Sequence, residues 1–240
     1  MINMESLLDY RHVVEKETKK VFVECIKKSL KEIKLKHIGF VGIIGSHKEK
    51  YSHDIDVLLF PSKDSKIGDT ILEIGNFYNK INSIIKKHHE RLYLALCPRK
   101  NMQEMVYYLS SLEEGGAGMI PVHSLFFPDY KSFKKFNPKG FEKEITKNLI
   151  TLYGKFEVIK SVESLPQEKL EPYFILLDFE MNSKIKNFPR HLVRVSAESL
   201  FSYLRDKYSL KIKKGSLHNI SEIEAEIRRI VKELDKLNYS

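Results

Sequence analysis

The segment GIIGSHKEKYSHDIDVLLF, residues 42–60, decides how the fold is interpreted. An apolar run ends at Gly45-Ser46, a short polar loop follows, and a second apolar run carries Asp54 and Asp56. Side chains alternate along a strand, so these two carboxylates project from one face, roughly 7 Å apart along the chain. The apolar residues between and after them then point the other way, into a core.

Two carboxylates this close repel each other unless they are protonated or share a cation. Mg²⁺ binds one or two carboxylates and leaves its other positions to water and substrate phosphates. Gly45 lets the backbone approach a phosphate closely, and the Ser46 hydroxyl can hydrogen-bond to a phosphate oxygen. The segment therefore predicts a triphosphate cradle beside a metal site, although each half alone also occurs as an ordinary turn or a solvent-facing strand end.

The hydrophobic pattern predicts an α/β (α+β) sheet domain over residues 1–135, followed by an all-helical domain over 136–240. Runs of branched residues predict strands at 37–45, 54–60, 91–98 and 119–128. Apolar residues spaced by three and four predict helices at 4–33, 68–89, 101–114, 141–156, 165–185, 189–208 and 221–237. Asn187 and Ser221 are candidate N-caps of the last two helices.

Composition and local pattern indicate the expected partners and compartment. The net charge is +9, which favours polyanionic partners but equally fits a soluble, lysine-rich surface. Cys25 and Cys97 are far apart in the sequence and lack metal-ligand spacing, so we expect buried thiols in a reducing compartment. The first residues lack a signal-peptide pattern and no apolar run is long enough to span a bilayer. We therefore expect a cytoplasmic protein with no membrane partner.

The order of the motif resembles the polymerase-β-like nucleotidyltransferase superfamily, whose signature is an apolar strand, Gly-Ser, a loop, and Asp-h-Asp-h with h apolar. The residues that match are Gly45, Ser46, Asp54, Ile55, Asp56 and Val57. The loop between them is shorter than in most members. The resemblance implies a nucleotidyltransferase-like sheet, nucleotide binding at Gly45-Ser46, and Asp54 and Asp56 as catalytic metal ligands. It also implies a site for two Mg²⁺ ions, with Mn²⁺ as a substitute.

Members of this family place a third carboxylate on a neighbouring strand, and here the chain departs from them. The position expected for that acid falls on His123, which is a poor Mg²⁺ ligand but a workable general base. Glu90 or Asp129 could instead supply a carboxylate from a strand end, and His123 could simply hydrogen-bond to a backbone carbonyl. These alternatives stay open on the sequence alone.

In the helical half, Arg190 and Arg194 lie one turn apart and could bind a triphosphate tail or the backbone of an acceptor. A solvated helix face explains them equally well. The resemblance implies transfer of a nucleoside monophosphate from an NTP, by default ATP, to a hydroxyl on RNA, tRNA or a protein. The rival interpretation is a catalytically degenerate relative that binds a nucleotide or a partner.

Overall fold

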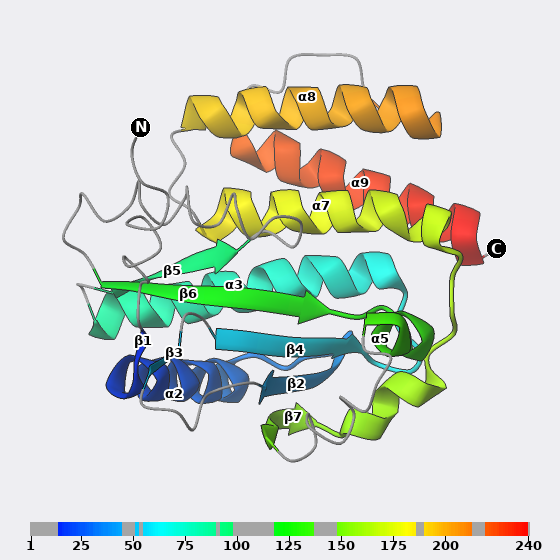
Figure 1. Cartoon of the computed structure of the whole chain (residues 1–240). Coiled ribbons are helices and arrows are strands. Elements are labelled where there is room, and N and C mark those ends of the chain that lie inside the picture. The colour runs from blue at the N-terminus through cyan, green and yellow to red at the C-terminus, as the bar shows by residue number, and fades with distance from the viewer. Residues whose placement is uncertain are drawn as a thin grey trace, which may run out of the picture.

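A computed structural model describes residues 14–44, 51–52, 55–89, 92–97, 118–136, 148–185, 190–212 and 219–239. Its centre is a mixed five-stranded sheet in the order β5-β6-β4-β2-β7 (Figure 1). The strands are β2 (Ile38–Ile44), β4 (Ile55–Pro61), β5 (Leu92–Cys97), β6 (Gly118–Phe126) and β7 (Ile150–Gly154). The pairs β4–β6 and β5–β6 are parallel, whereas β2 runs antiparallel to both β4 and β7. A separate two-stranded sheet pairs β1 (Val14–Glu15) with β3 (Tyr51–Ser52).

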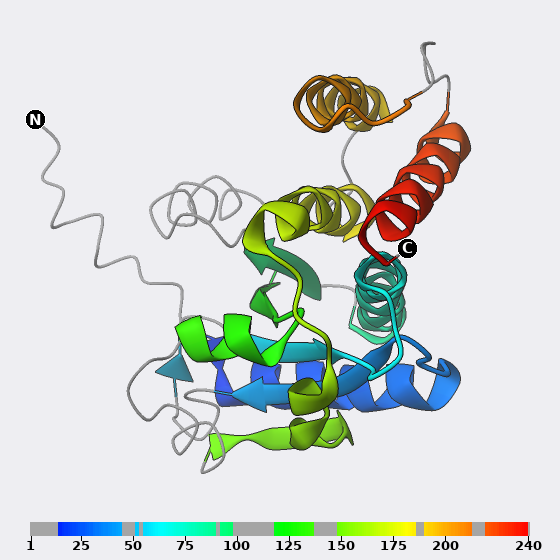
Figure 2. The same cartoon turned by 90° about the vertical axis from the view of Figure 1, so that its right-hand side faces the viewer.

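Helices surround this sheet. They are α2 (Lys16–Glu32), α3 (Ile67–His88), α5 (Tyr130–Phe136), α7 (Gln167–Ile185), α8 (Arg190–Tyr208), α9 (Ile220–Tyr239) and the 3₁₀ helix η2 (Phe156–Ser161). The two views agree that α8 is the outermost helix, beyond α7 and α9 (Figures 1 and 2). The described residues thus form a mixed α/β fold, as the hydrophobic pattern predicts.

The larger core lies on one face of the sheet and continues into the carboxyl-terminal helices. Alternate residues of β4, among them Val57 and Leu59, are fully buried in it. They pack with apolar residues from α2, α3, α7, α8 and α9. The last three helices therefore share one core with the sheet. Cys25 is buried in this core as a free thiol, as expected, and burial raises the pKa of that thiol.

The opposite face of the sheet carries a smaller, aromatic core. Leu58 and Phe60 of β4 point into it and meet side chains of α5 and η2. Phe60 lies 5.7 Å from Phe133 and 5.5 Å from Phe156 between ring centroids, in edge-to-face and tilted arrangements that aromatic quadrupoles favour. These contacts hold α5 and η2 against the sheet (Figure 2).

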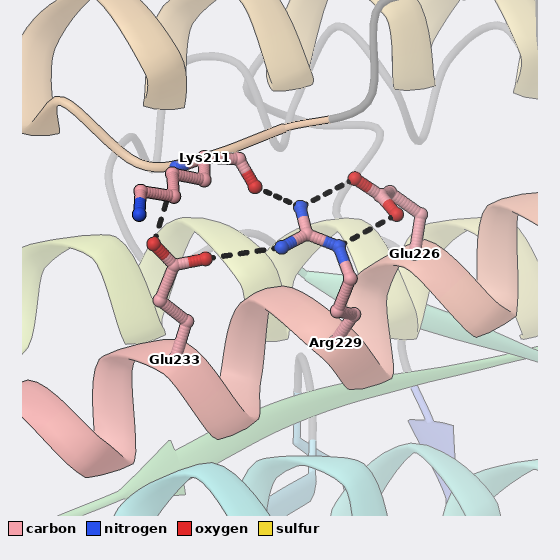
Figure 3. A network of polar contacts seen from close by, with 4 residues as sticks. All are labelled: Lys211, Glu226, Arg229 and Glu233. Atoms are coloured by element: carbon pink, nitrogen blue, oxygen red, sulfur yellow. Dashed lines mark hydrogen bonds and ion pairs between the residues drawn. The ribbon is translucent and has the colours of Figure 1, made fainter.

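A charged network fastens α9 to the segment that follows α8 (Figure 3). Arg229 donates to both carboxylate oxygens of Glu226, at 2.6 and 2.9 Å, and to Glu233 at 3.1 Å. The same guanidinium donates to the carbonyl of Lys211, whose N–H donates to Glu233 at 3.1 Å. Bidentate geometry and a satisfied backbone make this a positioning contact rather than a loose surface pair.

The helical predictions need three corrections. Residues 150–154 form the strand β7, so the predicted helix over 141–156 is wrong there and the second half is not all-helical. Residues 14–15 form β1, and helix α2 begins only at Lys16. The N-cap of α9 is Asn219, whose side chain accepts the N–H of Glu222 at 2.9 Å, rather than Ser221. Asn187 and residues 101–114 lie outside the described residues, and the boundary at 135/136 stays a prediction.

Candidate active site

The Gly-Ser…Asp-x-Asp segment connects two antiparallel strands in the middle of the sheet. Strand β2 ends at Ile44, immediately before Gly45, and β4 begins at Ile55, immediately after Asp54. Gly45, Ser46 and Asp54 themselves lie outside the described residues. Within this connection, β3 pairs with β1, which ties the connection to the chain that leads into α2.

Asp56 is the candidate site residue that the structure places best. It lies on β4, between Ile44 of β2 and His123 of β6, each its register partner. Its side chain is half-buried, whereas Leu58 and Phe60, further along the same face, are completely buried. Asp56 therefore lies at the margin of the aromatic core, as the second residue of β4.

His123 lies near the middle of the neighbouring strand β6. Its register partners are Asp56 on β4 and Cys97 on β5. The next residue, Ser124, is the partner of Val57 and interacts with Tyr78 of α3, so it faces the larger core. Because successive strand residues alternate between faces, position 123 falls on the face of Asp56. The side chain of His123 is outside the described part, and its role stays a prediction.

The contact on the α3 side is a buried hydroxyl pair. Tyr78 and Ser124 approach each other, although neither hydroxyl makes a hydrogen bond of normal geometry in the described part of the chain. Burial raises the pKa of Tyr78 well above its usual range, and Ser124 offsets this only in part. We therefore interpret the two hydroxyls as polar groups buried in the core rather than as a general acid and base.

The two alternative sources of a third carboxylate fare differently. Asp129 is buried and accepts the N–H of Ser132 at 2.6 Å, which makes it the N-cap of α5. The sequence already carried this signal, because an Asp directly before a short helical run favours a cap. Glu90 is outside the described residues.

Arg190 and Arg194 lie at the start of α8. The Arg194 side chain is exposed, and its Nε lies 3.8 Å from Glu198 Oε1, one turn further along the helix. Only the helical backbone of Arg190 is described. Nucleotide binding by these two arginines stays a prediction.

Of the two expected ligands of a divalent cation, only Asp56 is among the described residues. Asp56 has a half-buried carboxylate near the start of β4, and a carboxylate is a ligand type that suits a hard cation. No group of three or more His, Cys, Asp or Glu side chains that could hold a metal occurs among the described residues, which do not include Asp54. The helices described here also include none that is long and apolar enough to cross a membrane.

Comparison of the chain with protein-family models, with curated proteins and with solved structures finds no match. The functional argument therefore rests on the residues and on their placement in the sheet.

Proposed function

We propose that the chain is a metal-dependent nucleotidyltransferase. The observation that carries the proposal is the position of Asp56, half-buried on β4 between antiparallel β2 and parallel β6. In the sequence, the connection between β2 and β4 carries Gly45, Ser46 and Asp54, so we expect the phosphate cradle and both acids near the end of β2 and the start of β4. Its resemblance to the polymerase-β-like superfamily supports the same assignment.

Each residue has a definite role in this proposal. Gly45 and Ser46 bind the triphosphate, and Asp54 and Asp56 hold Mg²⁺, or Mn²⁺ in its place. The bound ion would neutralise charge on the phosphate oxygens. A bond forms between the acceptor hydroxyl oxygen and the α-phosphorus. The bond from the α-phosphorus to the oxygen that bridges it to the β-phosphorus breaks, and pyrophosphate leaves. His123 takes the hydroxyl proton as general base.

A second candidate function follows from His123. The resembled family places a carboxylate on the neighbouring strand, whereas the register partner of Asp56 on β6 is a histidine. This departure favours a catalytically degenerate protein that still binds a nucleotide or a partner. Both candidates allow ATP binding, but only the enzyme predicts turnover.

The decisive experiment measures pyrophosphate release from ATP with Mg²⁺, with RNA, tRNA or a protein extract as acceptor. The active protein releases pyrophosphate, and Asp54→Asn or Asp56→Asn abolishes release while thermal unfolding stays cooperative. Asp64→Asn is the matched control, because Asp64 is an exposed acid in the turn after β4 and should leave turnover unchanged. ATP binding without release in any acceptor mixture would favour the degenerate candidate.

A further inference from the structure

Lysine side chains gather on the two short helices that cover the aromatic core. The segments 130–136 and 155–161 contain five lysines and a single acid, Glu157. All five lysine side chains are exposed: Lys131, Lys134, Lys135, Lys155 and Lys160. Phe133 of α5 and Phe156 of η2 have ring centroids 5.6 Å apart, so the two short helices form one continuous surface. This surface lies on the opposite side of the sheet from α2 and α3.

Tyr130 organises the middle of this surface. The Nζ atoms of Lys134 and Lys160 lie 5.0 and 5.5 Å from the centroid of its ring. The ring itself stacks on Phe133 at 6.2 Å between centroids, which fixes its orientation. A cation–π contact holds an ammonium group in place and leaves its positive charge intact. Two lysines from different helices therefore converge on one ring.

Lys135 also contacts a neutral partner. Lys135 Nζ donates to Gln167 Oε1 at 3.1 Å. Elsewhere the chain neutralises exposed lysines with acids, as in Lys27–Glu24 at 2.8 Å and Lys207–Glu171 at 2.9 Å. On α5, by contrast, Lys134 and Lys135 are positioned by an aromatic ring and an amide. These two contacts hold the ammonium groups of Lys134 and Lys135 in place and leave their positive charges intact.

We propose that the α5–η2 surface binds the phosphodiester backbone of a nucleic acid. Several ordered ammonium groups on one surface suit a chain of phosphates, because each neutralised phosphate releases a condensed counterion. Tyr130 is half-buried and stacked on Phe133, so the surface contacts phosphates and does not read bases. This inference goes beyond the proposed function, since the binding requires neither a nucleoside triphosphate nor a metal ion.

Fluorescence anisotropy with a labelled single-stranded oligoribonucleotide of mixed sequence, without ATP or Mg²⁺, tests the proposal. The full chain should bind, and log K should fall linearly with log salt. Lys131→Gln combined with Lys134→Gln should reduce the salt slope by about one per lysine lost. Lys28→Gln combined with Lys31→Gln is the matched control, an exposed pair with the same spacing on α2 and the same change in net charge. Thermal melts should be unchanged, since all four lysines are exposed.

Three results would overturn the proposal. One is the absence of binding at low salt. Another is an equal decrease in salt slope for the double variant on α2, because net charge alone would then explain the effect. The third is binding to phosphatidylserine vesicles without binding to RNA, which would assign the surface to a membrane. None of these results depends on catalysis, so a failure of the nucleotidyltransferase proposal leaves this test intact.

Discussion

The carboxylate of Asp235 on α9 accepts a hydrogen bond from the backbone N–H of Gly68, the second residue of α3, at 3.2 Å. It also accepts the hydroxyl of Tyr173 on α7 at 2.8 Å. One buried acid thus caps α3 and joins three helices. A β-carbon at Gly68 would approach an Asp235 oxygen to 2.6 Å and Val231 to 2.3 Å, so the contact requires glycine. This contact makes the packing of α9 against α3 sensitive to pH.

Burial raises the pKa of Asp235 above its ordinary value of 3.8, and the bonds from Tyr173 and Gly68 offset this only in part. The unfolded chain therefore releases this proton first as pH rises. Between the unfolded and folded pKa values the native state binds more protons, so the free energy of unfolding decreases with rising pH. Urea titrations across this window should show that decrease in the wild type and a flatter profile in Asp235→Asn. An equally flattened profile in Asp64→Asn, an exposed acid, would contradict the assignment to Asp235.

Gly154 closes the edge strand β7 against β2. It has φ of 71°, and an added β-carbon would lie 1.8 Å from the carbonyl oxygen of Gly39. Gly154→Ala combines an unfavourable backbone region with a clash against backbone, so we expect a loss of about 2 kcal/mol or more in the free energy of unfolding. Chemical denaturation checks this, with Thr151→Ala at an exposed position of the same strand as the control. Equal stability in both variants would show that β7 tolerates displacement.

Ser209, directly after α8, has φ of 52°, a left-handed conformation that favours glycine. Ser209→Gly should raise the free energy of unfolding by about 0.5–1 kcal/mol, because relief of the β-carbon strain exceeds the added entropy of the unfolded chain. Ser209→Ala retains the β-carbon and should bring no such gain. Thermal melts of the two variants side by side provide the measurement, and a gain with alanine would point to a different cause.

The sequence predicts the fold well where the local pattern fits one kind of element, and less well where pairing with a distant strand can override that pattern. In β4 the apolar run from Ile55 to Phe60 and the following Pro61 left little choice, and a strand is observed there. Residues 150–154 show the opposite case. Their apolar spacing fits a helix, but the edge of β2 offers backbone partners, and Gly154 in a left-handed conformation ends the segment. Pairing with a distant strand decided the outcome, and no local propensity reports such a partner.

The site follows the same logic. The motif spacing alone identifies Asp56 as a candidate site residue, because an apolar strand rarely carries two acids on one face. The hydrophobic pattern predicts no helix over 130–136, so the cap signal of Asp129 has no helix to act on there; the aromatic contacts that hold α5 appear only in the fold. The domain boundary predicted at 135/136 falls within α5, and only the fold brings Lys160 of η2 and Lys134 of α5 to one tyrosine ring.

Ser46 provides a binding prediction that is independent of turnover. Removing a hydroxyl that donates to a charged phosphate oxygen should weaken ATP–Mg²⁺ binding by about 1 kcal/mol. Isothermal titration of Ser46→Ala measures this, and Gly45→Val should lose more because a branched side chain blocks the phosphate. Unchanged affinity in both variants would place the triphosphate elsewhere on the chain.

The last prediction concerns His123, the register partner of Asp56 on β6. As general base it must be neutral, so the transfer rate should fall as pH drops through an imidazole pKa, ordinarily about 6.5. His123→Ala should cost on the order of a hundredfold in rate. His123→Asp should retain or raise activity, because it restores the carboxylate that the resembled family carries at this position.

The aspartate variant separates the two candidate functions. If the wild type is an active enzyme, alanine lowers the rate, aspartate preserves it, and the acidic limb of the pH profile moves downward because a carboxylate replaces the imidazole. If the wild type is a degenerate binding protein, alanine changes nothing, and aspartate is the substitution that creates turnover. Full activity of His123→Ala, with an unchanged pH profile, would remove His123 from the mechanism, and Asp54 and Asp56 would then have to act with another base.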